Sequence, residues 1–369
     1  MDWYYNQIKP EHEEIRLDFL FDYGLFLAKI ITVVVAIVSI LVIVKSVGGR
    51  QGARKGSLEI TDLTERYKDT VHHLESHLFD KPLLKAREKA EKKAEKEKGK
   101  ARQNEIKAAA KSGELSATRE PRLFVLDFHG SIDAKEVAGL REEISAILAV
   151  AAEGDEVLLR LETGGGMVHG YGLASSQLDR LKQAGIKLTI AVDKVAASGG
   201  YMMACVADQI ISAPFAVVGS IGVIAQLPNF SKVLKKNDIE FEQITAGEFK
   251  RTLTMFGENT DKAREKFQSE IEATHGLFKD FIAEHRPALD LDTVATGEHW
   301  FGKQAITLGL VDSIGTSDDY IMKACKDREV LQVHYAQRKK LAERLAGAGS
   351  EAADSLLLKW ISRGQRPIM

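Results

Sequence analysis

Short apolar runs alternate with longer amphipathic segments between residues 122 and 207, and this alternation limits the fold more than any other feature of the sequence. The short runs, each a predicted strand, are Arg122–Phe128, Glu156–Leu161 and Lys187–Val192. Helical spacing of apolar residues predicts helices over Asp133–Val150 and Leu173–Ala184, and a further apolar helix opens at AASGG and runs to residue 207. Strands that alternate with helices of this length predict a parallel sheet in an α/β domain.

Two glycine-rich segments follow predicted strands. Gly164–Gly172 (GGGMVHGYG) follows the second strand, and AASGG (196–200) follows the third. Ligands of parallel α/β folds bind beyond the carboxyl ends of the strands, so we expect both segments to face one crevice. The first segment does not fit a dinucleotide-binding GxGxxG pattern, because a pattern that starts at Gly164 would place its last glycine at His169.

Ser198 is a candidate nucleophile at the predicted junction of a strand and a helix. The Gly199 N–H at the start of that helix, together with an amide of the Gly164–Gly166 loop, would hold an oxyanion and stabilise a transition state by several kcal/mol. The alternative is an ordinary serine N-cap followed by two glycines that pack closely. The motif alone does not decide between the two.

A nucleophilic serine needs a general base. His129 and His169 lie near predicted strand ends, but neither has an obvious carboxylate to orient it. The other candidate is Lys250, within GEFKRT. A lysine has an ordinary pKa of about 10.4, so it acts as a base near neutral pH only where burial lowers that pKa by ~3 units or more. The alternative is an exposed lysine beside Arg251.

The segment Tyr23–Val44 is apolar except for Lys29. As a helix it would span roughly 33 Å, enough to cross a hydrocarbon core of ~30 Å. Its acidic flank and its length favour a retained anchor over a cleaved signal peptide. Basic residues are more frequent after the segment than before it, which predicts a single-pass membrane protein with residues 45–369 in the cytoplasm. Gln209–Ser231 also lacks charge, but its prolines and glycines predict short buried strands.

The regions around the α/β segment differ in composition. Residues 46–120 are predicted to form a charged helical stalk, with an apolar stripe from Leu63 to Leu78 and a stretch rich in Lys and Glu after Pro82. The domain that carries the chemistry is expected over residues 121–333 and includes a long helix at Thr260–His285. A basic helical tail is expected over residues 334–369.

Composition excludes some functions. The net charge of −2 gives no overall field that would attract nucleic acid. The only two cysteines, Cys205 and Cys325, lie among apolar residues and outside any CxxC pattern. A zinc site or a disulfide framework is therefore not expected. Instead, we expect both cysteines to be buried free thiols.

Five segments in order carry a family resemblance. They are GGGM (164–167), AASGGYMMA (196–204), GSIGV (219–223), AGEFK (246–250) and ATGEHWFGKQAITLGLVDSIG (295–315). From about Pro121 to Gly315 the chain resembles the signal peptide peptidase A family of membrane-bound Ser–Lys peptidases, and the whole chain looks like its SohB branch. One departure is visible: the family commonly has Ser-Pro before the glycines, whereas Thr163 and Gly164 stand here.

The resemblance implies a fold like that of Clp protease and crotonase. It implies Ser198 as nucleophile, Lys250 as general base, Ser220 as a group that orients the lysine, and Gly166, with Gly165 as the near alternative, as the oxyanion-hole glycine beside Gly199. No cofactor or metal is implied. Substrates would be signal-peptide-like or unfolded peptides. A homo-oligomer is expected, in which Lys250 serves the Ser198 of its own or of a neighbouring chain.

Two alternatives belong to other classes: a crotonase-type acyl-CoA enzyme, and a non-catalytic membrane scaffold. The family is often placed on the outer, periplasmic face of the inner membrane, which conflicts with the distribution of basic residues.

Overall fold

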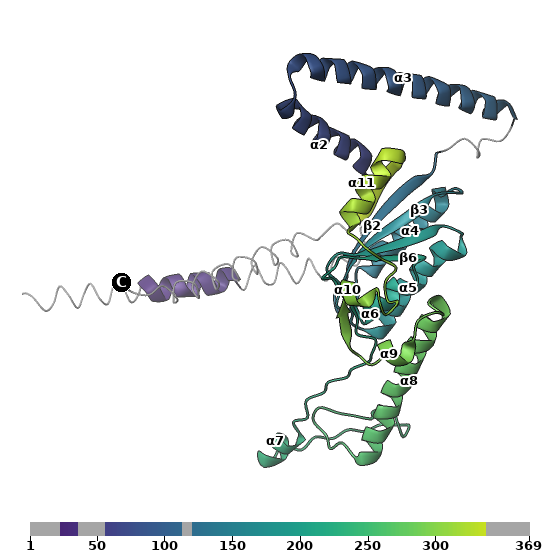
Figure 1. Cartoon of the computed structure of the whole chain (residues 1–369). Coiled ribbons are helices and arrows are strands. Elements are labelled where there is room, and N and C mark those ends of the chain that lie inside the picture. Colours follow the sequence, from purple (N-terminus) through teal and green to yellow (C-terminus); the bar gives the residue numbers. More distant parts are fainter. Residues whose placement is uncertain (1–22, 36–55, 113–119, 337–369) are drawn as a thin grey trace, which may run out of the picture. The chain divides into compact units, whose positions relative to one another are not determined.

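The computed structural model describes residues 23–35, 56–112 and 120–336 (Figure 1). The chain divides into two compact units, Met1–Ser57 with Gln337–Met369, and Leu58–Ala336. Within the first unit, residues 23–35 form a helix with exposed side chains. Nearly all of the described elements, and with them the candidate site, belong to the second unit.

The structure contradicts the predicted membrane location. Of the predicted segment Tyr23–Val44, the structure describes residues 23–35, which form a helix, and residues 36–44 lie outside the described residues. In the part of the chain that the structure describes, no helix combines the length and the apolar character that crossing a bilayer requires. The single-pass anchor at Tyr23–Val44 is therefore not supported, and the inner-membrane location that rested on it is wrong.

The larger sheet has seven strands in the order β1-β10-β2-β3-β4-β6-β9. Their bounds, in that order, are Ser57–Asp62, Glu329–Ala336, Arg122–His129, Glu156–Glu162, Lys187–Val192, Gln209–Ser212 and Ser313–Ile314. All neighbouring strands from β10 to β9 run parallel. The parallel sheet of an α/β fold is thus confirmed.

Alternation along β2 separates the two faces of this sheet. Phe124, Leu126 and Phe128 face a large core that includes the apolar sides of α4 (Val137–Val150), α5 (Val168–Gln183), α6 (Gly199–Ala204) and α8 (Asp261–His285). Leu123 and Val125 face a smaller core with α2 (Leu63–Leu78) and α11 (Ser317–Asp327). Both faces of the sheet are covered, as is usual for parallel sheets.

The compact unit begins earlier than the predicted domain at residue 121. β1 joins the sheet edge beyond β10, and Leu63 and Tyr67 of α2 pack against the smaller core. The Thr64 hydroxyl accepts a hydrogen bond from the Val330 N–H at 2.8 Å. The charged segment after α2 forms α3 (Lys81–Ser112). At the other end, residues 334–336, predicted as the start of a helical tail, complete β10, and the remainder of that tail lies outside the described residues.

A smaller sheet is built from β5 (Val195–Ala197), β7 (Val217–Gly219) and β8 (His299–Phe301). β5 and β7 run parallel, and β7 and β8 antiparallel. A parallel bridge between Thr163 and Ala196 links this sheet to the end of β3. The short strands predicted within Gln209–Ser231 are present as β6 and β7.

Residues 224–260, here called the arm, connect β7 to α8 and contain α7 (Ser231–Lys236). The ring of Phe256 packs against those of Phe230 and Phe241, with centroid distances of 6.2 and 5.9 Å. Most other apolar side chains of the arm are exposed; Ile244 is 95% exposed. After α8, the short helices α9 (Leu291–Val294) and α10 (Gly302–Ala305) flank β8.

Candidate active site

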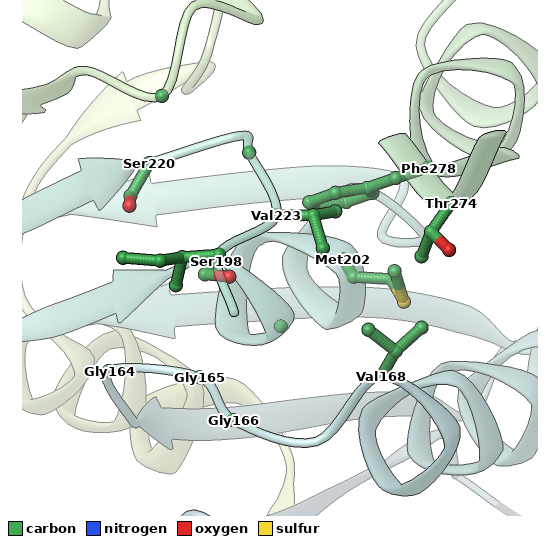
Figure 2. A pocket seen from close by; sticks show the side chains of 14 residues that line it. Gly164, Gly165, Gly166, Val168, Ser198, Met202, Ser220, Val223, Thr274 and Phe278 are labelled. Atoms are coloured by element: carbon green, nitrogen blue, oxygen red, sulfur yellow. The ribbon is translucent and has the colours of Figure 1, made fainter. Parts of the chain in front are cut away.

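The two glycine-rich segments meet at one cavity of about 460 Å³, as expected from the strand ends they follow (Figure 2). Ser198 lies between the Gly164–Gly166 loop and Ser220 (Figure 2). The other end of the cavity is mainly apolar and is formed by Val168 of α5, Met202 of α6, Val223, and Thr274 and Phe278 of α8.

Ser198 has a strained backbone. It joins β5 to α6 with φ 53° and ψ −116°, a combination that non-glycine residues rarely adopt and that costs about 1–3 kcal/mol. The Ser198 N–H donates to the Gly219 carbonyl at 2.8 Å, and its carbonyl accepts from the Met202 N–H at 3.0 Å. Its side chain makes no capping hydrogen bond to α6. The half-buried hydroxyl therefore faces the cavity instead of serving as an ordinary N-cap.

The two glycines after Ser198 are required by close packing. A Cβ on Gly199 would lie 2.4 Å from Cγ of Tyr171, and a Cβ on Gly200 would lie 2.8 Å from Cγ2 of Thr163. The alternative interpretation is thus correct that the two glycines pack closely, but not that Ser198 is an ordinary N-cap. Both glycines bring the start of α6 close to the end of β3 and the start of α5.

The Gly164–Gly166 loop contacts the Ser198 turn directly. Gly165 has φ +85°, and a Cβ there would lie 2.7 Å from both the Ala197 carbonyl and the Gly199 nitrogen. A Cβ on Gly166 would lie 2.1 Å from the Ile132 carbonyl oxygen. Only glycine fits at either position.

The amides of the loop differ in availability. The Gly165 N–H donates to Thr163 Oγ1 at 3.1 Å. The N–H groups of Gly166 and Gly199 make no hydrogen bond to any other residue that the structure describes. These two amides are therefore the ones free to bind an oxygen atom in the cavity, which favours Gly166 over Gly165.

Ser220 follows β7 and also lines the cavity. Its φ is 52°, and its N–H donates to the Glu298 carbonyl at 2.6 Å. The preceding Gly219 packs on the indole of Trp300, where a Cβ would lie 2.8 Å from a ring carbon. Trp300 of β8 and the Glu298 carbonyl beside it thus fix the turn that carries Ser220.

Lys250 does not line the cavity in this chain. It lies in the arm with an exposed side chain, and its N–H donates to the Gly247 carbonyl at 3.2 Å. Its neighbours are attached to the beginning of α8: the carboxylate of Glu248 pairs with Lys262, and the ring of Phe249 lies 5.8 Å from the Lys262 Nζ. The cavity touches α8 further along, at Thr274.

The two histidines considered as bases are also outside the cavity. His129 is exposed, with Nδ1 3.6 Å from Glu162 Oε2, so this histidine does have a carboxylate beside it. His169 is exposed on α5. Neither contributes to the cavity lining.

Sequence reasoning missed several residues of the site. Phe278 lines the cavity from α8, and its place there depends on how that helix packs. Thr163 and Tyr171 are buried beneath the site, at 3% and 0% exposure. No local pattern singled out Tyr171, and Thr163 had appeared only as a departure from the family's usual residue.

The cysteines have no role at this site. Cys205 and Cys325 are both buried and free, which confirms the predicted thiols. Burial raises the pKa of Cys205 to about 12. In the described part of the chain, no group of three or more His, Cys, Asp or Glu residues is arranged to hold a metal ion.

The fold and this site match a family of peptidases: the chain belongs to peptidase family S49. The N-terminal model of that family matches residues 18–178, and the peptidase family S49 model matches residues 180–331. A protein named "Probable protease SohB" from Haemophilus influenzae is 51% identical over 95% of this chain and 99% of its own length. Another protein of the same name, from Buchnera aphidicola subsp. Acyrthosiphon pisum, is 50% identical over 93% of this chain and 98% of its own. The resemblance inferred from the sequence motifs is confirmed.

More distant similarities are also found. "Protease 4" of Haemophilus influenzae is 28% identical over 53% of this chain and 32% of its own length. A solved structure of a 1510-N membrane-bound stomatin-specific protease mutant, in complex with a substrate peptide, is 14% identical. It covers 63% of this chain and 99% of that chain, with a TM-score of 0.39.

Proposed function

We propose that this chain is a serine endopeptidase whose nucleophile is Ser198 and whose general base is Lys250, on a fold of the Clp protease and crotonase type. The observation that carries the proposal is the strained Ser198, whose hydroxyl faces a cavity beside the free amides of Gly166 and Gly199. A strained nucleophile on a sharp strand-to-helix turn, with backbone N–H groups beside it, is the arrangement that acyl transfer requires.

The reaction would begin with attack of Ser198 Oγ on a peptide carbonyl, while its proton passes to neutral Lys250. The N–H groups of Gly166 and Gly199 would bind the oxyanion, and removal of one such donor in other peptidases lowers kcat by ~10²–10³. Ser220 would orient the lysine by a hydrogen bond. The protonated lysine gives its proton to the leaving amine, and Lys250 then activates the water that hydrolyses the acyl-enzyme.

We propose that Lys250 comes from a neighbouring chain in this mechanism. The side chains next to it lie against the beginning of α8: Glu248 pairs with Lys262, and the Phe249 ring lies 5.6 Å from the Lys266 Nζ. The cavity meets α8 at Thr274, eight residues beyond Lys266, which corresponds to about 12 Å of helix. We therefore propose a homo-oligomer in which the Lys250 of one chain approaches the Ser198 of the next.

The surface of the arm supports such an assembly. Ile224 and Ile244 are 79% and 95% exposed, and Phe249 next to Lys250 is 43% exposed. Large exposed apolar patches are uncommon on monomers. Coverage by a second chain would also remove water from the lysine, which favours the uncharged amine that the mechanism needs.

The cavity supports peptides with small or apolar side chains as substrates. Next to Ser198 it is lined by glycines, and beyond them by Val168, Met202 and Phe278. A side chain that enters this apolar end exchanges water for hydrocarbon, which favours binding by ~25 cal/mol per Å². Substrates are then extended or unfolded segments, such as signal-peptide-like sequences.

The first test uses the full-length chain with a fluorogenic apolar peptide and with casein. Ser198→Ala and Lys250→Ala are expected to abolish cleavage. The matched controls are Ser176→Ala, which removes an exposed serine hydroxyl on α5, and Lys236→Ala, which removes an exposed lysine of the arm; both should cleave like the unmodified protein. Cleavage that survives in Ser198→Ala would rule out the nucleophile. Cleavage that survives only in Lys250→Ala would assign the base to another residue.

The second test addresses the shared site. Chains with Ser198→Ala and chains with Lys250→Ala, each carrying a different tag, are co-expressed and purified through both tags. If adjacent chains share each site, mixed oligomers contain some sites with an intact pair and regain part of the activity. Mixed oligomers that stay inactive, although both tags are present, would show that Lys250 does not serve a neighbour.

A further inference from the structure

Two buried hydroxyl groups lie beneath the candidate oxyanion site. The Thr163 hydroxyl and the Tyr171 hydroxyl are 2.5 Å apart, at 3% and 0% residue exposure. The Tyr171 hydroxyl also lies 2.8 Å from the Ser131 carbonyl oxygen, and the Thr163 hydroxyl lies 3.1 Å from the Gly130 carbonyl oxygen. Thr163 Oγ1 also accepts the Gly165 N–H at 3.1 Å.

Counting the protons of this pair shows that Thr163 Oγ1 can accept the Gly165 N–H in every arrangement. Two hydroxyl protons serve three contacts: Thr163 to Tyr171, Thr163 to the Gly130 carbonyl, and Tyr171 to the Ser131 carbonyl. Whichever two contacts hold the protons, an oxygen lone pair of Thr163 remains for the Gly165 N–H. The bond that holds the glycine loop therefore persists in each arrangement.

The same two residues contact the Ser198 turn. The Thr163 N–H donates to the Val195 carbonyl at 2.9 Å, and the Ala197 N–H donates to the Thr163 carbonyl at 3.1 Å. Gly200 packs on Thr163, and Gly199 packs on the ring of Tyr171. Thr163 thus joins the end of β3 to the strand that leads into Ser198, and Tyr171 supports the first residue of α6.

The loop before Thr163 completes the support. The Ile132 carbonyl accepts the Met167 N–H at 2.8 Å, immediately after Gly166. The Ser131 hydroxyl donates within its own turn to Glu136 at 2.8 Å. Gly166 is therefore held from both sides, by the Thr163 bond before it and by the Ile132 bond after it.

We propose that Thr163 and Tyr171 are positioning residues, which set the distance between the Gly166 amide and Ser198 through one buried hydroxyl pair. The inference rests on the proposed function and deepens it, because it assigns the geometry of the oxyanion site to two residues that touch no substrate.

The test compares four variants of the full-length chain. Thr163→Val and Tyr171→Phe each remove one hydroxyl with little change in shape, and Thr163→Ser keeps the hydroxyl. Tyr201→Phe is the matched control: Tyr201 is also 0% exposed, and its hydroxyl donates to the Leu310 carbonyl at 3.0 Å, away from the glycine loop. For each variant, kcat and KM are measured with the fluorogenic peptide, together with the rate of inactivation by a fluorophosphonate. The phosphoryl oxygen of this reagent gains negative charge when the serine attacks phosphorus, so it needs the same amides.

We expect Thr163→Val and Tyr171→Phe to lower kcat and the inactivation rate by about tenfold to a hundredfold, since a misplacement of about 1 Å has an effect of this size. KM should stay within about twofold. Thr163→Ser should restore kcat, and Tyr201→Phe should leave kcat unchanged even if it unfolds at a lower urea concentration.

Two results would overturn the inference without touching the proposed function. One is a kcat within about twofold of the unmodified chain in both Thr163→Val and Tyr171→Phe, while Ser198→Ala is inactive. The other is a loss of kcat in Tyr201→Phe equal to that in Tyr171→Phe, which would mean that any buried tyrosine hydroxyl has the same effect. Activity in Ser198→Ala would instead remove the proposed function itself.

Discussion

Substitution of Gly199 by alanine tests how closely the turn that carries Ser198 is packed. The new Cβ would lie 2.4 Å from Cγ and 2.8 Å from Cβ of Tyr171, whereas ordinary contacts of a Cβ begin near 3.4 Å. These atoms lie at the root of a fully buried side chain, so the ring cannot rotate away. The backbone of the turn must move by about 1 Å to relieve the contact.

Two effects of known size follow from this displacement. Overpacking of a core position lowers the free energy of unfolding by ~1–3 kcal/mol. Alanine has a greater helix preference than glycine, and this preference offsets up to ~1 kcal/mol of that loss. We therefore expect the free energy of unfolding to fall by about 1–2 kcal/mol. Because the Gly199 N–H and Ser198 move together, kcat should fall about a hundredfold or more.

The assay pairs urea denaturation with peptide cleavage, and Gly172→Ala on the neighbouring helix α5 serves as the control. A Cβ on Gly172 meets nothing within 4 Å, so this change should raise the free energy of unfolding by ~0.5–1 kcal/mol and leave kcat unchanged. If Gly199→Ala is as stable and as active as the unmodified chain, the argument that Tyr171 limits the position of this turn is refuted.

Three further predictions concern groups outside the site. Burial raises the pKa of Glu143, so at pH values between the ordinary pKa and the raised one the folded state binds more protons than the unfolded state. The free energy of unfolding should therefore fall as pH rises through that range. Urea denaturation of Glu143→Gln should not show this fall. Arg286 donates to both oxygens of Asp312, at 2.8 and 2.7 Å; Arg286→Ala should lower the free energy of unfolding by ~1.5–3 kcal/mol at pH 7. Burial alone would raise the pKa of Asp312, but the hydrogen bonds from Arg286 and from the Ile210 N–H, together with the positive charge of Arg286, outweigh burial and lower that pKa. The loss in Arg286→Ala should therefore shrink as pH falls through the lowered pKa. Cys205 should not react with a thiol reagent at pH 8 until urea unfolds the chain, because burial raises its pKa to about 12; rapid labelling of the folded chain would contradict this.

The central strands were predictable almost to the residue. β2, β3 and β4 lie within one residue of their predicted ends, because each is a compact apolar run in a sheet covered on both faces. The strand-to-helix turn at Ser198 was also predictable, since small residues at the end of a buried strand leave few other conformations. What the motif did not reveal is the strain at Ser198, which depends on the Gly219 carbonyl from a distant strand.

Elements that depend on distant partners were not predictable. The stripe of α2 was visible, but not that Leu63 and Tyr67 pack on the smaller core. β10 was partly assigned to a tail because its partner β2 lies about 200 residues earlier. The Thr163–Tyr171 pair forms only when β3 and α5 pack together, so no local pattern marks it.

Because the site is divided between two sheets, the width of its cavity depends on how the two sheets pack against each other. Ser198 and Ser220 are carried by the smaller sheet, and the glycine loop is carried by β3 of the larger one; Thr163 joins them. A slight tilt of one layer over the other would widen or narrow the mouth of the cavity while every side chain that lines it stays the same. Selectivity could then evolve through substitutions at half-buried positions such as Trp300, far in sequence from both serines.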